Sequence, residues 1–162
     1  MAKRTDPSGR LKLAEKIPIF RGLSPDQVQK VLHAGKMESF EQGKLLCKEG
    51  ENSVSMFILL SGELVAKSKG VVLANLKPVE ILGEMGVITK EPRSATLEVI
   101  ENATALSISK IRFDVLLKQD IDMTFKIYKN LLESLSQKVR DNNARLIQSE
   151  LESDREIAAF NV

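Results

Sequence analysis

The segment from Gly83 to Thr96 contains the residue types that could bind a phosphate. Gly83 and Gly86 can adopt backbone angles closed to other residues and let the main chain approach a ligand. The N–H groups of the short turn that follows can then point at an anion. Arg93 adds a rigid fork of donors that binds phosphate oxygens two at a time, and Ser94 adds one hydroxyl donor. The spacing therefore predicts an anion-binding loop.

Glu84, between the two glycines, requires a separate explanation. A carboxylate repels a phosphate unless it faces another part of the ligand. Because an ionised acid only accepts hydrogen bonds, a sugar hydroxyl is the obvious partner. The alternative is an ordinary surface ion pair between Glu84 and Arg93, which usually contributes about 0–1 kcal/mol. The glycines and the small residues around Arg93 favour the phosphate site.

This segment resembles the phosphate-binding cassette of the cyclic nucleotide-binding domain family, which includes the catabolite activator protein and the regulatory subunits of the cAMP-dependent kinase. The family pattern is Gly-Glu-aliphatic-small, a short helix, then Pro-Arg-Ser/Thr/Ala-Ala. This chain has Gly83-Glu84-Met85-Gly86 and Pro92-Arg93-Ser94-Ala95. The resemblance implies that Glu84 accepts the ribose 2′-hydroxyl and that Arg93 pairs with the cyclic phosphate. It also implies a ligand lining formed by the backbone of Gly83, Met85, Gly86, Ser94 and Ala95.

One departure from the family pattern lies just before the cassette. The family usually has a glycine followed by an acid and an aromatic residue, whereas this chain has Pro78-Val79-Glu80-Ile81-Leu82. The missing turn glycine changes the loop shape that we expect at the pocket entrance. The binding residues themselves are retained.

Length and composition indicate one globular domain with an appendage. The chain has 162 residues, of which 43% are hydrophobic and 28% charged, values near the average for globular domains. Its net charge of +2 gives no strong attraction to nucleic acid, so we expect no nucleic-acid partner. No apolar segment has the length of a signal peptide or a membrane span, so we expect a cytoplasmic protein without a membrane partner.

Cysteine and histidine are too few for most disulfide or metal chemistry. Cys47 is the single cysteine, which excludes an intramolecular disulfide. In an apolar run it is expected to be a small core residue, with a reactive thiol as the alternative. His33 is the single histidine, and no cluster of carboxylates accompanies it. We therefore expect no metal, no cofactor and no catalytic residue.

The chain is expected to divide into an arm, a barrel and a long helix. Residues 1–9 contain Pro7, Ser8 and Gly9 among charged residues. This composition predicts a mobile arm. Residues 10–118 predict the binding domain with its N-terminal helices, of which the first spans about residues 11–16 before a proline. Residues 119–162 predict a C-terminal helix for dimerisation and ligand closure.

A second helix is expected to begin at Ser24. The segment Phe20-Arg21-Gly22-Leu23-Ser24-Pro25 is similar to the Phe-x-x-Leu-Ser/Thr-Pro segment of the family. Ser24 predicts an N-cap and Pro25 the first helical position. The apolar spacing continues the helix to about Ala34.

Strand patterns occupy the middle of the chain. Short apolar runs alternate with Gly-containing turns, which indicates a sandwich or a barrel. The runs cover residues 37–40, 44–47, 55–60, 63–67, 71–76, 94–100 and 104–109. The resemblance specifies an eight-stranded jelly-roll β-barrel. The expected fold class is therefore mostly β with flanking helices and a long C-terminal α-helix.

The C-terminal part predicts a short helix over residues 111–118 and a long one from about Asp122. Apolar residues recur there at alternating spacings of four and three, as in a two-stranded coiled coil. The seam comprises Ile121, Phe125, Tyr128, Leu132, Leu135, Val139, Asn142 and Leu146. The alternative is a helix that packs only on its own barrel. Because a helix of this length overhangs a small barrel, we expect a homodimer through it.

The resemblance implies a sensor that binds a cyclic nucleotide and couples binding to the position of the long helix. Arg140 or Asn143 is expected to cap the base. cAMP is the first candidate ligand, as the commoner ligand of bacterial relatives, and cGMP is the alternative. The sequence ends before a helix-turn-helix could fit, so we expect a stand-alone sensor that signals to a protein effector.

Two other functions are compatible with the residues. One is a degenerate domain that has lost nucleotide binding and acts as a dimeric scaffold, which the altered Val79-Glu80 segment suggests. The other is a small-barrel enzyme of the cupin type, which a bound stoichiometric metal would reveal. The single histidine argues against that enzyme.

Overall fold

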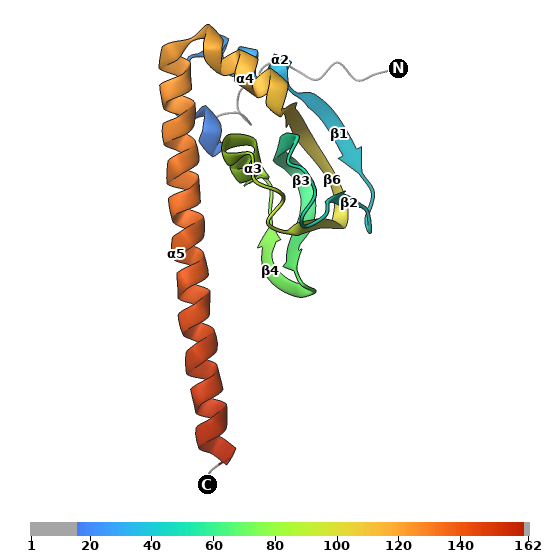
Figure 1. Cartoon of the computed structure of the whole chain (residues 1–162), viewed down its shortest axis with the longest axis vertical. Coiled ribbons are helices and arrows are strands. Elements are labelled where there is room, and N and C mark those ends of the chain that lie inside the picture. Colours follow the sequence, from blue (N-terminus) through green and yellow to red (C-terminus); the bar gives the residue numbers. More distant parts are fainter. Residues whose placement is uncertain (1–15, 161–162) are drawn as a thin grey trace.

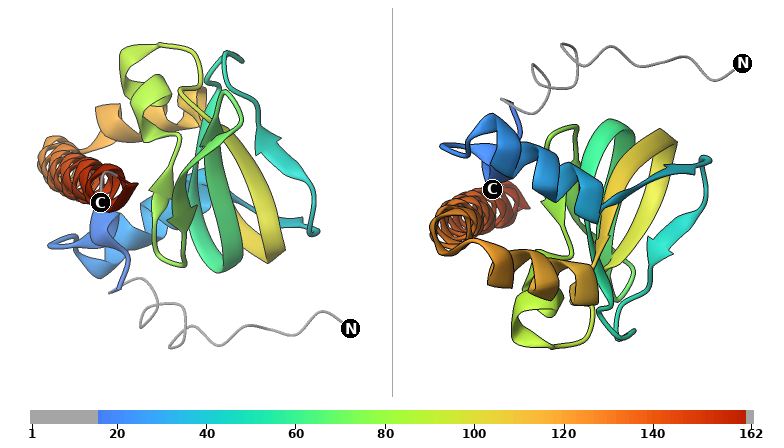
Figure 2. Two further views of the ribbon diagram at one scale, coloured as in Figure 1. Left: turned by 90° about the horizontal axis from the view of Figure 1, so that it is seen from below. Right: turned by 90° about the horizontal axis from the view of Figure 1, so that it is seen from above.

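The computed structural model describes residues 16–160, which form a curved sheet, a group of short helices and one long helix (Figure 1). The expected arm at residues 1–9 and nearly all of the helix expected at 11–16 lie outside the described residues. Seen along the long helix, the sheet curls on itself and the helices gather at one side of it (Figure 2).

Six antiparallel strands form the sheet among the described residues. They are β1 (Lys36–Phe40), β2 (Leu45–Cys47), β3 (Ser55–Ser68), β4 (Val71–Leu76), β5 (Ile81–Leu82) and β6 (Thr96–Ser109). The hydrogen-bonded order is β1-β6-β3-β4, with β2 also on β6 and β5 also on β3. The expected mostly-β class is confirmed. The pairing path is open, however, in place of the closed eight-stranded barrel that we expected.

The strand count differs because two expected turns are irregularities within long strands. β3 and β6 each run for 14 residues, although the sequence suggested a break in each. Gly62 takes a positive φ of 82°, and the register with β6 shifts on both sides of Ser61. A bulge of this kind bends a strand without ending it. Each pair of expected strands is therefore one continuous bent strand.

Local signals in the sequence account for the helix beginnings. The helices are η1 (Pro18–Phe20), α2 (Pro25–Ala34), α3 (Glu84–Thr89), α4 (Lys110–Gln119) and α5 (Ile121–Phe160). Ser24 caps α2, as predicted, and forms a capping box with Gln27. The predicted helices at 111–118 and from about Asp122 correspond to α4 and α5. At 40 residues, α5 is roughly 60 Å long, so it projects well past the sheet (Figure 1).

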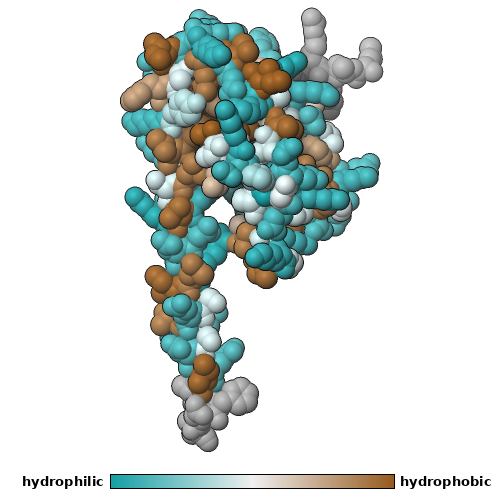
Figure 3. All heavy atoms as spheres, in the orientation of Figure 1, coloured by the Kyte–Doolittle hydropathy of each residue, from teal (hydrophilic) through white to brown (hydrophobic). Residues whose placement is uncertain are grey.

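Among the described residues of α5, the buried apolar side chains all lie in its first part. Met123, Ile127 and Leu131 are buried in a core with η1, α2, α4 and the inner residues of β3 and β6. A second apolar cluster lies within the curl of the sheet, around Leu59 and Leu64. The predicted seam lies on a different face of α5, where Leu132 is 65% and Val139 59% exposed. Brown hydrophobic side chains accordingly mark the outside of the helix (Figure 3).

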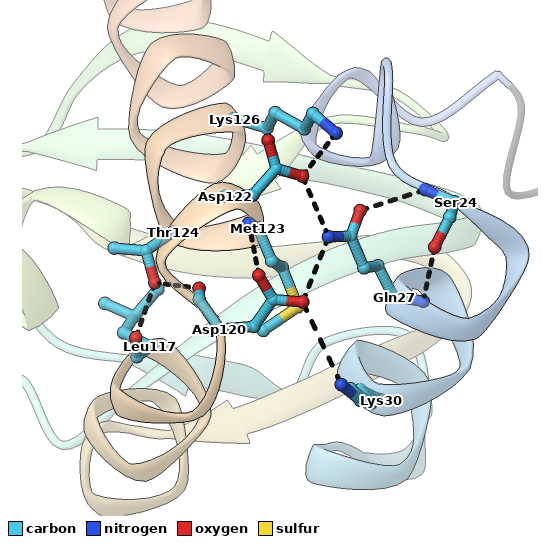
Figure 4. Close-up of polar contacts among 9 residues, drawn as sticks. All are labelled: Ser24, Gln27, Lys30, Leu117, Asp120, Asp122, Met123, Thr124 and Lys126. Carbon is cyan, nitrogen blue, oxygen red and sulfur yellow. Dashed lines mark hydrogen bonds and ion pairs between the residues drawn. The ribbon is translucent and has the colours of Figure 1, made fainter.

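Polar contacts fix the junction between α4 and α5 (Figure 4). The buried Gln27 side chain donates from Nε2 to the carboxylates of Asp120 and Asp122, each at 3.1 Å. Asp120 also caps α5 by accepting from the Met123 N–H. Lys126 pairs with Asp122 at 2.6 Å. These contacts tie the start of α5 to α2.

Candidate functional site

Gly83 connects β5 to α3 and shapes the predicted anion-binding loop. Its φ of 72° lies in the left-handed region that favours glycine. A Cβ at this position would collide with Nη1 of Arg93. Gly86 lies inside α3, where a Cβ would collide with the Ser53 hydroxyl. Both glycines are therefore required by the close packing of this loop.

Arg93 is the buried cation of the site. It is 7% exposed, and its guanidinium donates to the backbone oxygens of Gly83 at 3.2 Å and Ser55 at 2.6 Å. It also lies over the Phe57 ring, with its Cζ 5.8 Å from the ring centre. Its Nε is buried without a hydrogen-bond partner. No carboxylate within residues 16–160 pairs with it.

Glu84 does not pair with Arg93, so the surface ion pair considered above is not formed. Glu84 is 3% exposed, and its Oε1 lies 2.7 Å from Nζ of Lys138 on α5. Lys138 Nζ also donates to the Ile81 carbonyl at 2.6 Å. A buried carboxylate requires such a partner because its desolvation is costly. This contact joins the loop to the long helix.

A cavity of about 1280 Å³ opens between α5 and the sheet. That volume exceeds the roughly 300–1,000 Å³ of a typical small-molecule site, so the cavity includes the open space under the helix that Figure 3 shows. Its wall on the sheet side includes the apolar residues Ala66, Leu82 and Leu97 and the polar residue Asn75. Glu84 and Arg93 are among its lining residues.

The cavity brings together the seven residues predicted to line the ligand: Gly83, Glu84, Met85, Gly86, Arg93, Ser94 and Ala95. Met85 and Ser94 are exposed, whereas Ala95 is half-buried. Of the two residues predicted to cap the base, one lines the cavity and the other does not. Arg140 lines the cavity, and Asn143 is not among its lining residues.

Sequence reasoning missed Lys138 and Arg145, both of which line the cavity from α5. Arg145 donates from Nη1 to the Leu73 carbonyl of β4. Neither residue belongs to a motif. Their spacing of seven places them on one helix face, which is a signal available in the sequence. Which face meets the cavity depends on how α5 crosses the domain.

Val79 occupies the position where the family pattern has a glycine. It takes a φ of 72°, a conformation that β-branched residues rarely adopt. The backbone around it is bonded to β3, because the Val79 N–H donates to the Leu59 carbonyl and the Leu59 N–H to the Glu80 carbonyl. Position 79 therefore has the left-handed backbone conformation that favours glycine, although its residue is valine.

Cys47 is part of the apolar cluster, as predicted, and also lines the cavity. Burial raises the pKa of its thiol, and the nearby charge of Arg93 partly opposes this effect. A raised pKa keeps the thiol protonated and unreactive near neutral pH. Among the described residues, no cluster of three or more metal-ligating side chains occurs. No helix within residues 16–160 is long and apolar enough to span a membrane.

Comparisons with a protein-family model and with individual relatives agree with each other. The family model described as "Cyclic nucleotide-binding domain" matches residues 37–120. A cyclic nucleotide-gated potassium channel of Mesorhizobium japonicum is 27% identical over 81% of this chain and 36% of the channel. A cGMP-dependent protein kinase of Eimeria tenella is 30% identical over 75% of this chain and 12% of the kinase. The chain therefore spans about a third or less of these two relatives.

The fold is also shared with solved structures. The catabolite activator protein of Thermus thermophilus superposes with a TM-score of 0.69 at 24% identity. The match covers 83% of this chain and 64% of that protein. At this identity, the similarity shows a shared fold.

Proposed function

Because this chain belongs to the cyclic nucleotide-binding domain family, we propose that it is a regulatory sensor that binds a cyclic nucleotide in the cavity between α3 and α5. cAMP is the first candidate and cGMP the alternative. The proposed roles are phosphate binding by Arg93 and ribose binding by Glu84. Gly83, Met85, Gly86, Ser94 and Ala95 line the ligand. No catalytic role is proposed.

The observation that carries this proposal is the state of Arg93. A guanidinium that is only 7% exposed normally has an anionic partner, because burying an unpaired charge is costly. Here its bonds go to neutral carbonyls, and its Nε has no partner. An anion placed at the adjacent α3 loop would supply the missing countercharge. A cyclic phosphate is such an anion.

The contact between Glu84 and Lys138 supports coupling of binding to α5. A group that hydrogen-bonds to the Glu84 carboxylate shares this acceptor with Lys138, whose Nζ lies 2.7 Å from Oε1 of Glu84. A ribose hydroxyl that bonds to Glu84 therefore changes the free energy of the helix position. Coupling of this kind is commonly about 1–3 kcal/mol. Arg140 lines the same cavity and is retained as a base-capping candidate, together with Asn143.

We further propose that the sensor acts in the cytoplasm as a homodimer and signals to a protein effector. The seam of α5 supports the dimer, because Phe125, Leu132 and Val139 are exposed on one helix face. Exposed apolar stripes of this length usually mark an interface. The effector would detect the position of α5 or of the N-terminal segment.

The test is isothermal titration of protein freed of ligand by unfolding and refolding, with cAMP, cGMP and 5′-AMP. We expect micromolar binding of a cyclic nucleotide and none of 5′-AMP. Arg93→Ala should weaken binding by about 1.5–3 kcal/mol or more, as for other hydrogen bonds to charged groups. Arg155→Ala is the matched control, because Arg155 lies on α5 but does not line the cavity.

Two results would contradict the proposal. Binding that persists in Arg93→Ala would remove the phosphate role of Arg93. No heat with any nucleotide, in a correctly folded protein, would favour the degenerate domain that acts as a dimeric scaffold.

A further inference from the structure

Arg93 is held in place by neutral groups. Its guanidinium donates from Nη1 to the Gly83 carbonyl at 3.2 Å and from Nη2 to the Ser55 carbonyl at 2.6 Å. Its Cζ lies over the Phe57 ring, 5.8 Å from the ring centre. Within residues 16–160, no carboxylate forms a salt bridge with it. The position of this buried cation therefore depends on two carbonyls and one aromatic face.

The Phe57 ring is itself fixed beside the anion-binding loop. Its backbone pairs with Leu82 of β5, and Gly83 follows Leu82 directly in the chain. Phe57 is buried, and its ring meets the Phe40 ring edge to face, with the centres 6.3 Å apart and 83° between the planes. This is a preferred geometry for an aromatic pair. The ring is thus held both by its strand and by a neighbouring ring, and α3 lies next to that strand (Figure 1).

An aromatic partner leaves the charge and the donors of Arg93 available to a ligand. A carboxylate in place of the ring would occupy N–H groups of the guanidinium and offset its positive charge. A ring face attracts the cation through its quadrupole and uses none of the N–H groups in the guanidinium plane. The Nε of Arg93 is buried without a hydrogen-bond partner. The side chain therefore has a fixed position and a donor left for an anion.

We propose that Phe57 is a positioning residue for phosphate binding and that it acts through Arg93. The contact lies within the range of about 6 Å at which a ring attracts a cation, and burial strengthens that attraction. A guanidinium that is fixed before the ligand arrives loses little conformational freedom on binding, so the affinity is higher. This inference rests on the proposed function, because it assigns Phe57 a role at the same site.

A purely structural role for Phe57 makes a different prediction. Phe57 belongs to the apolar cluster within the curl of the sheet, and a ring that only fills space there acts through its volume. A ring that holds Arg93 acts through the negative charge of its face. Fluorine withdraws electron density from the face and adds little volume. Fluorination therefore separates the two roles.

The experiment replaces Phe57 in the full chain with mono-, di- and trifluorinated phenylalanine and titrates each protein with cAMP and cGMP by calorimetry. The affinity should fall with each added fluorine, to a total loss of roughly threefold or more, as for a desolvated cation–π contact. The factor should be the same for each nucleotide that binds, because both carry the same cyclic phosphate.

The matched control is the same fluorinated series at Phe113. That ring is also buried, but it lies in the apolar cluster around the start of α5. Its fluorination should leave the affinities unchanged. Phe57→Leu is a second variant, which keeps an apolar side chain but removes the ring. Its affinity should fall at least as far as that of the trifluorinated protein, with circular dichroism to verify that the chain is folded.

The outcomes distinguish this inference from the proposal beneath it. If the wild-type chain binds a cyclic nucleotide and the affinity is constant throughout the Phe57 series, the positioning role is wrong and the sensor remains. An equal decrease in the Phe113 series would also overturn that role, since the loss would then come from a general effect on the core. If the wild-type chain binds neither nucleotide, both the sensor and the positioning role fail.

Discussion

At the scale of single residues, the absence of a side chain at position 83 shapes the candidate site. Gly83 allows Nη1 of Arg93 to lie where a Cβ would otherwise be, and the guanidinium then bonds the Gly83 carbonyl at 3.2 Å. Any larger residue at position 83 would displace Arg93 and strain the left-handed backbone. The glycine and the arginine therefore form one structural unit.

Val79 leads to a prediction about stability. A non-glycine residue in the left-handed region is strained by about 1–2 kcal/mol, and Val79→Gly removes that strain. The same change loses the packing of a half-buried side chain against the core. The two effects oppose each other, so we expect the free energy of unfolding to change by less than about 1 kcal/mol, measured by urea denaturation.

The control is Val87→Gly in α3, where the buried side chain has no compensating strain. This substitution should lower the free energy of unfolding several times more. A loss in Val79→Gly as large as that of the control would contradict the strain at position 79.

At the scale of elements, α5 makes two kinds of contact at different positions along its length. Met123, Ile127 and Leu131 attach it to the core, while Lys138 contacts the loop that holds Glu84. The helix is anchored at one end and touches the site further along. A change in the hydrogen bonding of Glu84 can therefore alter the position of the part of α5 that has no contact with the core.

Lys138 is expected to transmit ligand binding to α5. Hydrogen exchange followed by mass spectrometry should show that saturating cyclic nucleotide changes protection over residues 132–146 in the wild-type chain. In Lys138→Met the ligand should still bind through Arg93, but the change in protection should be largely lost. Lys138→Arg retains a cation for Glu84 and should preserve most of it. A full response in Lys138→Met would show that the helix is coupled by another route.

The α4–α5 junction predicts a dependence of stability on pH. Hydrogen bonds from the Met123 N–H and from Gln27 lower the pKa of Asp120, and bonds from Lys126 and Gln27 lower that of Asp122. Lys30 and Lys126 are the cations that face these carboxylates. A lowered folded-state pKa means that the contribution is complete above the ordinary value of 3.8. It is lost as the pH falls through the lower folded-state pKa values.

Thermal unfolding followed between pH 6 and roughly 3 tests this dependence. Stability should fall toward the acid end in the wild-type chain. The double variant Asp120→Asn and Asp122→Asn should show a smaller decrease over the same range. Gln27→Leu should lower stability at neutral pH, because it leaves the carboxylates without their shared donor. Parallel curves for the wild type and the double variant would contradict this account.

At the scale of the whole molecule, the length of α5 is the main feature to explain. A helix of 40 residues with an exposed apolar seam is not stable by propensity alone, since most helical stability comes from packing. A second copy packed along the seam would supply that contact. Asn142 within the seam would then favour one register.

The dimer prediction is tested by sedimentation equilibrium. The wild-type chain should sediment as a dimer of about twice its 18.0 kDa mass at micromolar concentration. Leu132→Glu combined with Val139→Glu should yield monomers, because four like charges cannot be buried in one seam. Gln148→Glu, also exposed on α5 but outside the seam, should remain dimeric. A monomeric wild-type chain would contradict the role assigned to the seam.

Features that depend on local chemistry can be predicted from the sequence. Four features follow from residue types and spacings within a few positions: the cap at Ser24, the glycines of the predicted anion-binding loop, the presence of an acid and an arginine in that loop, and the long helix. These features are readable because their interactions involve neighbours in the chain. The family follows from the same segment.

Features that depend on contacts between distant residues could not be predicted in this way. Lys138 and Glu84 are 54 residues apart, and Arg145 and Leu73 are 72 apart, so no local pattern links them. The number of strands depended on whether glycine bends or ends a strand, which cross-strand pairing with β6 determines. Val79 shows the same point, because bonds to Leu59 hold a conformation that the residue itself disfavours. Packing between remote segments thus selected which of the locally possible arrangements the chain adopts.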